Sequence, residues 1–272
     1  MVIHNTSIKI PPVFINRIFV RILSIVLGQI LVCSTLMAEP APNVIKIAMI
    51  DYPPLMAANG GIMNDLTEAA FQSQGVDVKF QVQPMSRITY SLEDGSFPAV
   101  LGTQSWSFKS EVVPVRLFLS GLYFFTLKEK FPRGVEFDTL EELSKYEIGY
   151  SRGGSLIPVF NKAKLNPVLV VKGDQNVQKL YFGRIDMFAS TELAGWGIIE
   201  KHYPNNINEF SISKKQIHKI SGDIIFSKHQ IKLIKTFKKG LETIKHNGTF
   251  LKVLQKYYKN REIPSYLLDG LK

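Results

Sequence analysis

The sequence has a single cysteine among its 272 residues, which limits the chemistry that the chain can carry. That residue, Cys33, lies in an N-terminal segment that we expect to be removed, so the mature chain has no thiol for a disulfide or a thiolate zinc site. The hydrophobic core alone must then hold the fold. A chain of about 230 residues can meet this demand, because it buries some 70% or more of its unfolded surface.

Catalytic and metal-binding motifs are also missing. The sequence contains no Gly-x-Ser-x-Gly elbow, no Walker loop and no His-Glu-x-x-His pair. The histidines are few and lack metal-ligand spacing: His4, His202, His218, His229 and His246. We therefore expect no metal, no cofactor and no enzymatic activity.

Long apolar runs are lacking as well. The run Ile22–Val32 is shorter than the roughly 20 residues that span a bilayer, and a polar, proline-containing segment follows Ala38. Basic residues and no acidic ones precede it: Lys9, Arg17 and Arg21. This pattern predicts a secretory signal peptide over residues 1–38 and a periplasmic location. Cleavage after Ala38 or after Ser34 fits the small residues there, and a retained membrane anchor is the alternative interpretation.

The mature chain is basic. Cleavage after Ala38 leaves 234 residues with 30 basic and 23 acidic side chains, a formal net charge of +7. Many of the lysines lie on predicted helices of the last quarter, where a solvated helix face explains them better than a nucleic-acid site. We expect a small anionic ligand, no nucleic acid, and a monomer, because no oligomerisation stripe is evident.

Hydrophobic periodicity indicates a chain that alternates between strands and helices. We predict strands at 44–50, 76–83, 99–102, 117–128, 147–150, 168–171, 185–190 and 224–226. We predict helices at 63–74, 86–93, 139–145, 155–164, 175–182, 193–202, 230–245 and 250–258. The alternation stops at the apolar run 117–128 and restarts after it. This order predicts two α/β units, each a mostly parallel sheet flanked by helices, with the second unit inserted into the first.

At this point the chain resembles the extracellular solute-binding proteins of family 3, the amino-acid type with the type 2 periplasmic fold. The resemblance runs from about Val44 to Tyr258. It rests on the order and spacing of short segments: Tyr52-Pro53-Pro54, Asp65-Leu66, Leu92-Glu93-Asp94-Gly95, Thr139-Leu140-Glu141-Glu142-Leu143, Ile148-Gly149-Tyr150, Gly183-Arg184-Ile185-Asp186, Ile244-Lys245-His246-Asn247-Gly248-Thr249 and Lys256-Tyr257-Tyr258.

The resemblance implies two lobes that close on a small polar ligand. Lobe 1 would comprise residues 43–125 and 225–272, lobe 2 would comprise 126–224, and hinge strands near 122–127 and 219–225 would join them. The resemblance also implies a carboxylate-bearing ligand, an amino acid or a related compound, passed to an inner-membrane ABC permease. Two alternatives stay open: a sensing module for a membrane receptor, or a periplasmic dehydratase-like enzyme in which Glu192 acts as acid or base.

Several ligand-binding residues follow from the matched positions. Tyr52 follows the first strand, where the family places an aromatic residue on the ligand; a rim or core tyrosine is the alternative. Ser105, Trp106 and Ser107 match the hydroxyl-rich ligand loop, although Trp106 also suits a core position. A glycine loop with Gly154 and Ser155 opens the expected helix at 155–164, so its N–H groups suit a carboxylate.

Other matched positions depart from the family. The carboxylate-clamping arginine is replaced near Ser110, with Lys109 beside it, and the aspartate for a ligand ammonium is replaced near Thr191 and Glu192. Arg87, at the start of a predicted helix, is our candidate for the missing bidentate contact, with a surface arginine as the alternative.

Overall fold

The computed structural model describes residues 44–259, 261–268 and 271, so the predicted signal peptide lies outside it. The strands are β1 (Ile45–Met49), β2 (Val78–Val82), β3 (Ala99–Gly102), β4 (Val112–Leu127), β5 (Ile148–Ser151), β6 (Val168–Val170), β7 (Met187–Thr191), β8 (Phe210–Ile212) and β9 (His218–Ser227). The helices are α2 (Ile62–Gln72), α3 (Met85–Ile88), α4 (Tyr90–Glu93), α5 (Ile157–Lys162), α6 (Asp174–Tyr181), α7 (Glu192–His202), α8 (Ile231–His246), α9 (Thr249–Tyr258), α10 (Ser265–Leu268) and the 3₁₀ helices η1 (Leu140–Lys145) and η2 (Ile207–Glu209).

All described strands join one sheet, in the order β2-β1-β3-β9-β4-β7-β5-β6, with β8 paired to β4. We call β1–β3 the β1 end of this sheet and β5–β7 its β5 end. Within each end the neighbouring strands are parallel, whereas every pair that includes β4 or β9 is antiparallel. The expected mostly parallel arrangement is thus present at each end, and β4 and β9 join the two ends into one mixed sheet.

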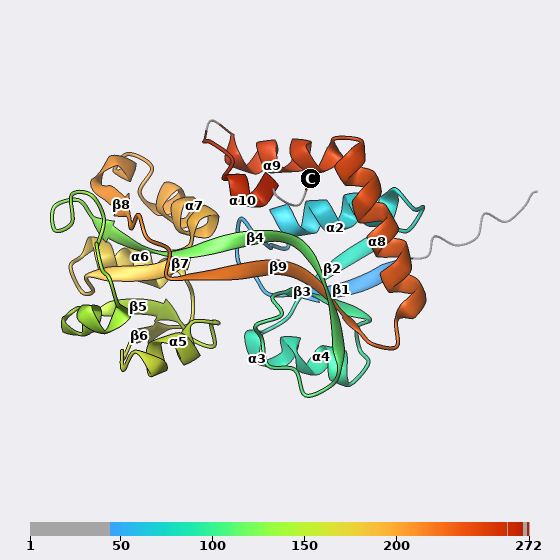
Figure 1. Cartoon of the computed structure of the whole chain (residues 1–272), viewed down its shortest axis with the longest axis horizontal. Coiled ribbons are helices and arrows are strands. Elements are labelled where there is room, and N and C mark those ends of the chain that lie inside the picture. Colours follow the sequence, from blue (N-terminus) through green and yellow to red (C-terminus); the bar gives the residue numbers. More distant parts are fainter. Residues whose placement is uncertain (1–43, 260, 269–270, 272) are drawn as a thin grey trace, which may run out of the picture. The chain divides into compact units, whose positions relative to one another are not determined.

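Two long strands connect the ends. β4 has 16 residues and β9 has 10, and they pair side by side along the middle of the sheet (Figure 1). Both exceed the predicted strands at 117–128 and 224–226, because the apolar pattern breaks at Arg116 and at His218–Lys219 while backbone pairing continues through these polar residues. The segments 122–127 and 219–225 lie within them.

The core of the β1 end has two layers because β1 is buried on both faces. Ile47 and Met49 pack with α2, α8 and α9 on one face, and Ala48 between them packs with α3 and α4 on the other (Figure 1). Strand residues alternate between faces, so this is the pattern expected of a parallel strand covered by helices on both sides. The apolar side chains at 66, 70 and 71 that predicted α2 lie in the first layer.

The β5 end repeats this arrangement on β7. Met187 and Ala189 pack in a cluster with α5 and η1, whereas Phe188 packs in a cluster with α6 and α7. Helix α7 also crosses to the other core, because Leu193 and Ala194 in its first turn belong to the cluster of the β1 end. The structure thereby places the start of α7 between the two sets of elements.

Three smaller predictions differ from the structure. The helix expected over 155–164 is only Ile157–Lys162, since Pro158 favours the first helical turn and Lys164 has φ 55°, which ends the helix. The helix expected over 86–93 is interrupted at Thr89, which keeps helical dihedral angles. The short elements β8 and α10 were not predicted, because neither offers enough residues to show a period.

Candidate functional site

A tyrosine from the β1 end meets a serine from the β5 end. Tyr52 follows β1, and its hydroxyl lies 3.0 Å from Oγ of Ser190, a buried residue on β7. The turn that carries Tyr52 also approaches α7, because a Cβ added at Gly197 would lie 2.9 Å from Cδ of Pro54. The predicted ligand-binding Tyr52 is therefore placed where the two ends touch, and it contacts the residue that precedes the predicted Thr191 in the sequence.

The glycine loop lies close to the same place through a second tyrosine. The Tyr150 hydroxyl accepts the Leu156 N–H at 3.0 Å, and its ring leaves no room for a side chain at Gly154, where an added Cβ would lie 2.5 Å from it. Burial raises the pKa of Tyr150 to about 12, and the nearby Tyr52 contributes to the shift. Tyr150 is thus neutral, and its hydroxyl holds the glycine loop in place near Tyr52.

The loop's own N–H groups are only partly used. Gly154 and Leu156 donate inside the loop, whereas no described residue accepts from the N–H of Gly153 or Ser155. The expected helix start at Ser155 is corrected, because α5 begins at Ile157 and has six residues. What remains for an anion is a pair of loop N–H groups rather than the end of a long helix dipole.

Arg87 lies on α3, which approaches the glycine loop. A Cβ added at Gly153 would be 3.4 Å from Cγ of Met85, two residues before Arg87. Arg87 itself is exposed, and no described carboxylate pairs with it. The structure therefore brings the Met85 side chain of α3, though not the Arg87 guanidinium, close to the loop of Gly154 and Ser155.

The hydroxyl-rich loop after β3 is anchored by buried groups. Asp223 on β9 accepts the Gln104 N–H at 2.7 Å, and the Thr103 Oγ1 accepts the Ser105 N–H at 3.2 Å. Asp223 is 1% exposed, and burial raises its pKa, while Ser221 and Gln104 lower it. The loop therefore leaves the sheet in a fixed direction, held by a carboxylate that lies outside the loop.

The predicted side chains of this loop have different surroundings. Trp106 is half-buried, packs with the α3 and α4 cluster and covers Gly102, where an added Cβ would lie 2.1 Å from the indole. Ser105, Ser107 and Lys109 are exposed, and the Lys109 backbone N–H donates to Glu93 at 2.7 Å. Trp106 thus packs against core residues, as expected if it has a structural role instead of a ligand-binding one.

Thr191 and Glu192 are adjacent but differently engaged. Thr191 is 4% exposed and precedes α7, and its Oγ1 has no partner among the described residues. The Glu192 carboxylate accepts the Tyr266 hydroxyl at 3.0 Å, and it raises the pKa of Tyr266 after the larger effect of burial. Thr191 thus offers an unused hydroxyl, whereas Glu192 is bound to the C-terminal segment.

Sequence reasoning missed three residues of this region. Ser190 and Tyr150 carry the contacts that join the predicted ones, and Asp223 fixes the ligand loop. Ser190 lies in the polar run Ser190-Thr191-Glu192 at the end of an apolar strand, a signal that was available. No sequence signal indicated the role of Asp223, because an acidic residue within an apolar strand does not show which residue it contacts.

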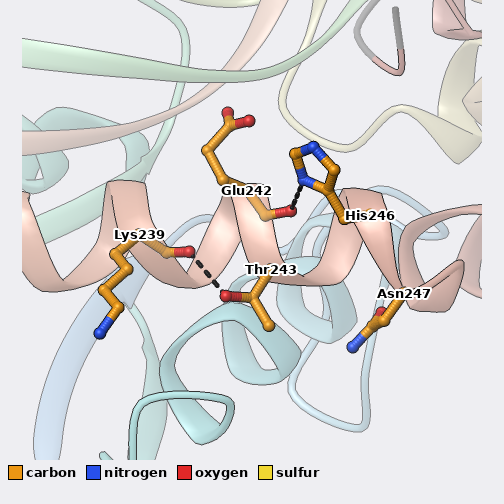
Figure 2. A pocket seen from close by; sticks show the side chains of 5 residues that line it. All are labelled: Lys239, Glu242, Thr243, His246 and Asn247. Carbon is orange, nitrogen blue, oxygen red and sulfur yellow. Dashed lines mark hydrogen bonds between the residues drawn. The ribbon is translucent and has the colours of Figure 1, made fainter.

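A depression on α8 shares none of these residues. It has a volume of about 510 Å³ and is lined by Lys239, Glu242, Thr243, His246 and Asn247 (Figure 2). Thr243 and His246 each contact a carbonyl of their own helix, those of Lys239 and Glu242. The basic and acidic side chains on this exposed helix face do not indicate one class of ligand.

Among the described residues no group of three or more His, Cys, Asp or Glu side chains is arranged to hold a metal ion.

No helix within residues 44–259, 261–268 and 271 is both long enough and apolar enough to cross a bilayer.

Comparison with known proteins gives no match by sequence, since neither a family model nor a curated protein matches the chain. A histidine kinase sensor domain similar to periplasmic binding proteins matches in structure with a TM-score of 0.66 and 19% identity, over 82% of this chain and 99% of that one. An ABC uptake substrate-binding protein from Streptococcus pneumoniae, with bound histidine, has a TM-score of 0.68 and 16% identity over 80% and 93%. An ancestral arginine-binding protein bound to arginine has a TM-score of 0.65 and 20% identity over 79% and 98%.

These similarities cover nearly the full length of each matched chain at low identity. They show the type 2 periplasmic binding fold, which the resemblance in the sequence predicted.

Proposed function

We propose that the chain is a periplasmic solute-binding protein that captures a small polar, carboxylate-bearing ligand and delivers it to a membrane transporter. The proposed lobes are residues 43–125 with 225–272, and residues 126–224. The observation that carries this proposal is the contact of Tyr52 with Ser190, which joins the two ends of the sheet at the predicted ligand-binding residues.

The contact supports a clamp because of where its partners lie. Tyr52 belongs to the β1 end and Ser190 to the β5 end, and only β4 and β9 join these ends within the sheet. Bending in those two strands would separate the two hydroxyls and open the space between them. A ligand that touches both ends favours the closed arrangement by its differential affinity.

The polar groups around this contact suit a carboxylate and its polar substituents. The N–H groups of Gly153 and Ser155 and the Thr191 hydroxyl have no partner among the described residues, and Arg87 lies on the adjacent helix. We propose that the loop N–H groups and the Arg87 guanidinium hold the carboxylate in the closed form.

The role of Arg87 is tested by calorimetry with a ligand identified by native mass spectrometry of the protein from its own periplasm. We expect Arg87→Ala to weaken binding by roughly 2–5 kcal/mol, because a charge-assisted bidentate pair is lost. Arg184→Ala removes an exposed arginine after α6 and serves as the matched control, with a change under about 1 kcal/mol. Unchanged affinity in Arg87→Ala would refute its role, and a loss in Lys109→Ala would move the anion site to that residue.

Closure is tested separately by small-angle scattering. We expect the radius of gyration to decrease when the identified ligand is added. The variant Gly154→Ala should prevent this decrease, because its Cβ has no space beside Tyr150. A ligand that binds without any compaction would refute the clamp.

A sensing role is the second candidate, favoured by the match to the histidine kinase sensor domain. A strain that lacks the protein separates the two. Transport predicts reduced uptake of the ligand, whereas sensing predicts unchanged uptake and loss of a ligand-dependent transcriptional response.

A further inference from the structure

A second cavity lies on the long strands and adjoins the predicted site, since its lining residue Tyr266 donates to Glu192 and its lining residue Tyr123 pairs with Ser190. It has a volume of about 460 Å³ and is lined by Leu119, Ser120 and Tyr123 of β4, Lys219 of β9, Lys214 and Gln216 of the connecting loop, and Tyr266 of α10. None of these residues belongs to the predicted site. Its volume falls in the range of small-molecule sites, roughly 300–1,000 Å³.

Strand geometry explains why the cavity forms there. Leu119, Gly121 and Tyr123 alternate onto one face of β4, and Lys219 lies directly opposite Gly121 in the antiparallel pair. Opposite residues of such a pair point to the same face, so Lys219 projects from the face that Leu119 and Tyr123 share. The Tyr123 ring lies over Gly121, where an added Cβ would be only 2.5 Å from it, so this ring can approach the strand and form one wall of the cavity.

The charge of the lining has one sign. Two lysines reach the cavity from different segments, and none of the described residues that line it is acidic. The neighbouring Lys215 shows the contrast, since its ammonium donates to the Asp138 carbonyl at 2.6 Å. Lys214 and Lys219 have no ion-pair partner among the described residues. Both lysines are exposed, so their flexible side chains can turn toward an anion in the cavity.

The remaining lining combines the polar Ser120 and Gln216 with apolar and aromatic side chains. Leu119 and the rings of Tyr123 and Tyr266 form walls, and the Tyr266 hydroxyl is already donated to Glu192. An inorganic ion would leave these walls without contact. We propose that this cavity is a second binding site, for a small anion with a carboxylate or phosphate group between Lys214 and Lys219 and an apolar body against the two tyrosine rings.

The charge requirement is tested with probes that differ only in the charged group. Benzoate and phenyl phosphate are titrated against benzyl alcohol and benzylammonium, with amide shifts of Gly121, Gln216 and Lys219 as the readout. We expect the two anions to shift these amides and the neutral and cationic probes to leave them unchanged. Equal binding of benzyl alcohol would overturn the proposal, and so would shifts confined to Tyr52 and Gly154.

The lysines are tested by a double variant with a charge-matched control. Lys214→Gln/Lys219→Gln should weaken benzoate binding by at least about tenfold, because two charge-assisted contacts are lost. Lys238→Gln/Lys239→Gln removes the same charge from exposed positions on α8 and should change the affinity by less than about twofold. Equal effects of the two pairs would show only a general charge effect and would overturn the site. The test uses no cleft ligand, so its outcome is independent of the proposed transport function.

Discussion

Two tyrosines near the C-terminus make the same bond in different places, which gives a matched test of the proposed lobes. The Tyr266 hydroxyl donates to Glu192 on α7, and the Tyr257 hydroxyl donates to Asp65 on α2, each at 3.0 Å. Leu267, next to Tyr266, is 2% exposed in the core of the β1 end. The Tyr266 bond therefore ties a segment held by the first core to α7, which packs in both cores, whereas the Tyr257 bond stays inside the first.

The expected loss differs because the two carboxylates have different partners. Asp65 keeps the Lys256 ammonium at 2.6 Å after Tyr257→Phe, so we expect a loss below about 1 kcal/mol. Glu192 has no other described hydrogen-bond donor, and hydrogen bonds to charged groups contribute about 1.5–3 kcal/mol, so we expect roughly 2 kcal/mol for Tyr266→Phe. Burial and then the Glu192 charge raise the pKa of Tyr266, which keeps the donor proton at neutral and mildly alkaline pH.

Urea unfolding measures the loss of stability, and small-angle scattering measures lobe opening. A shift of about 1.4 kcal/mol changes an equilibrium tenfold, so Tyr266→Phe should increase the open population and Tyr257→Phe should not. Identical scattering profiles of the two variants would refute the assignment of α7 to a separately moving lobe. Opening in Tyr257→Phe alone would refute the argument from the contacts.

Three further predictions concern the buried Asp223, the close helix contact at Gly240 and the absence of cysteine from the predicted mature chain. Burial raises the pKa of Asp223, so the folded chain holds this proton more tightly than the unfolded chain. The free energy of unfolding should therefore fall as pH rises from about 4 to the raised pKa, and Asp223→Asn should abolish this fall in urea titrations. Gly240→Ala should destabilise the fold by about 1–3 kcal/mol in the same assay, because its Cβ would lie 1.9 Å from the Ala70 carbonyl oxygen and force α8 away from α2. The melting temperature should be the same with and without dithiothreitol, because the predicted mature chain has no cysteine.

Each of these predictions has its own control and refuting result. Hydrogen bonds from Ser96 lower the pKa of Asp94, so Asp94→Asn should remove a pH dependence of the opposite sign, and equal slopes in both variants would contradict the assignment. Gly173→Ala, at φ −59° and with its nearest atom 3.3 Å away, should be tolerated; similar losses at 240 and 173 would refute the packing argument. A drop in melting temperature with reductant would contradict the predicted removal of Cys33.

Most long helices and two buried strands could be predicted, because their apolar residues follow the pattern typical of a helix or of a buried strand. Helices α2, α7, α8 and α9 begin and end within about two residues of the predicted positions, and the buried strands β1 and β7 agree nearly as well. The full extent of β4 and β9 could not be predicted. Exposed polar residues such as Arg116 and Lys219 give no strand pattern in the sequence, and only pairing with the neighbouring strand makes them part of a strand. The same reason hides the link between Asp223 and the ligand loop, which depends on pairing residues about 120 positions apart.

The position of β9 in the sheet has a consequence for how the chain acquires its fold during synthesis. β3 completes its ladder only with β9, where Ala99 pairs with Phe226, and α8 covers α2 from still further along the chain. Until the residues beyond about 226 have been made, β3 therefore lacks its antiparallel neighbour and α2 lacks the helix that packs on it. We therefore expect the β1 end to reach its full stability only late in synthesis, after β9 and α8 have joined it.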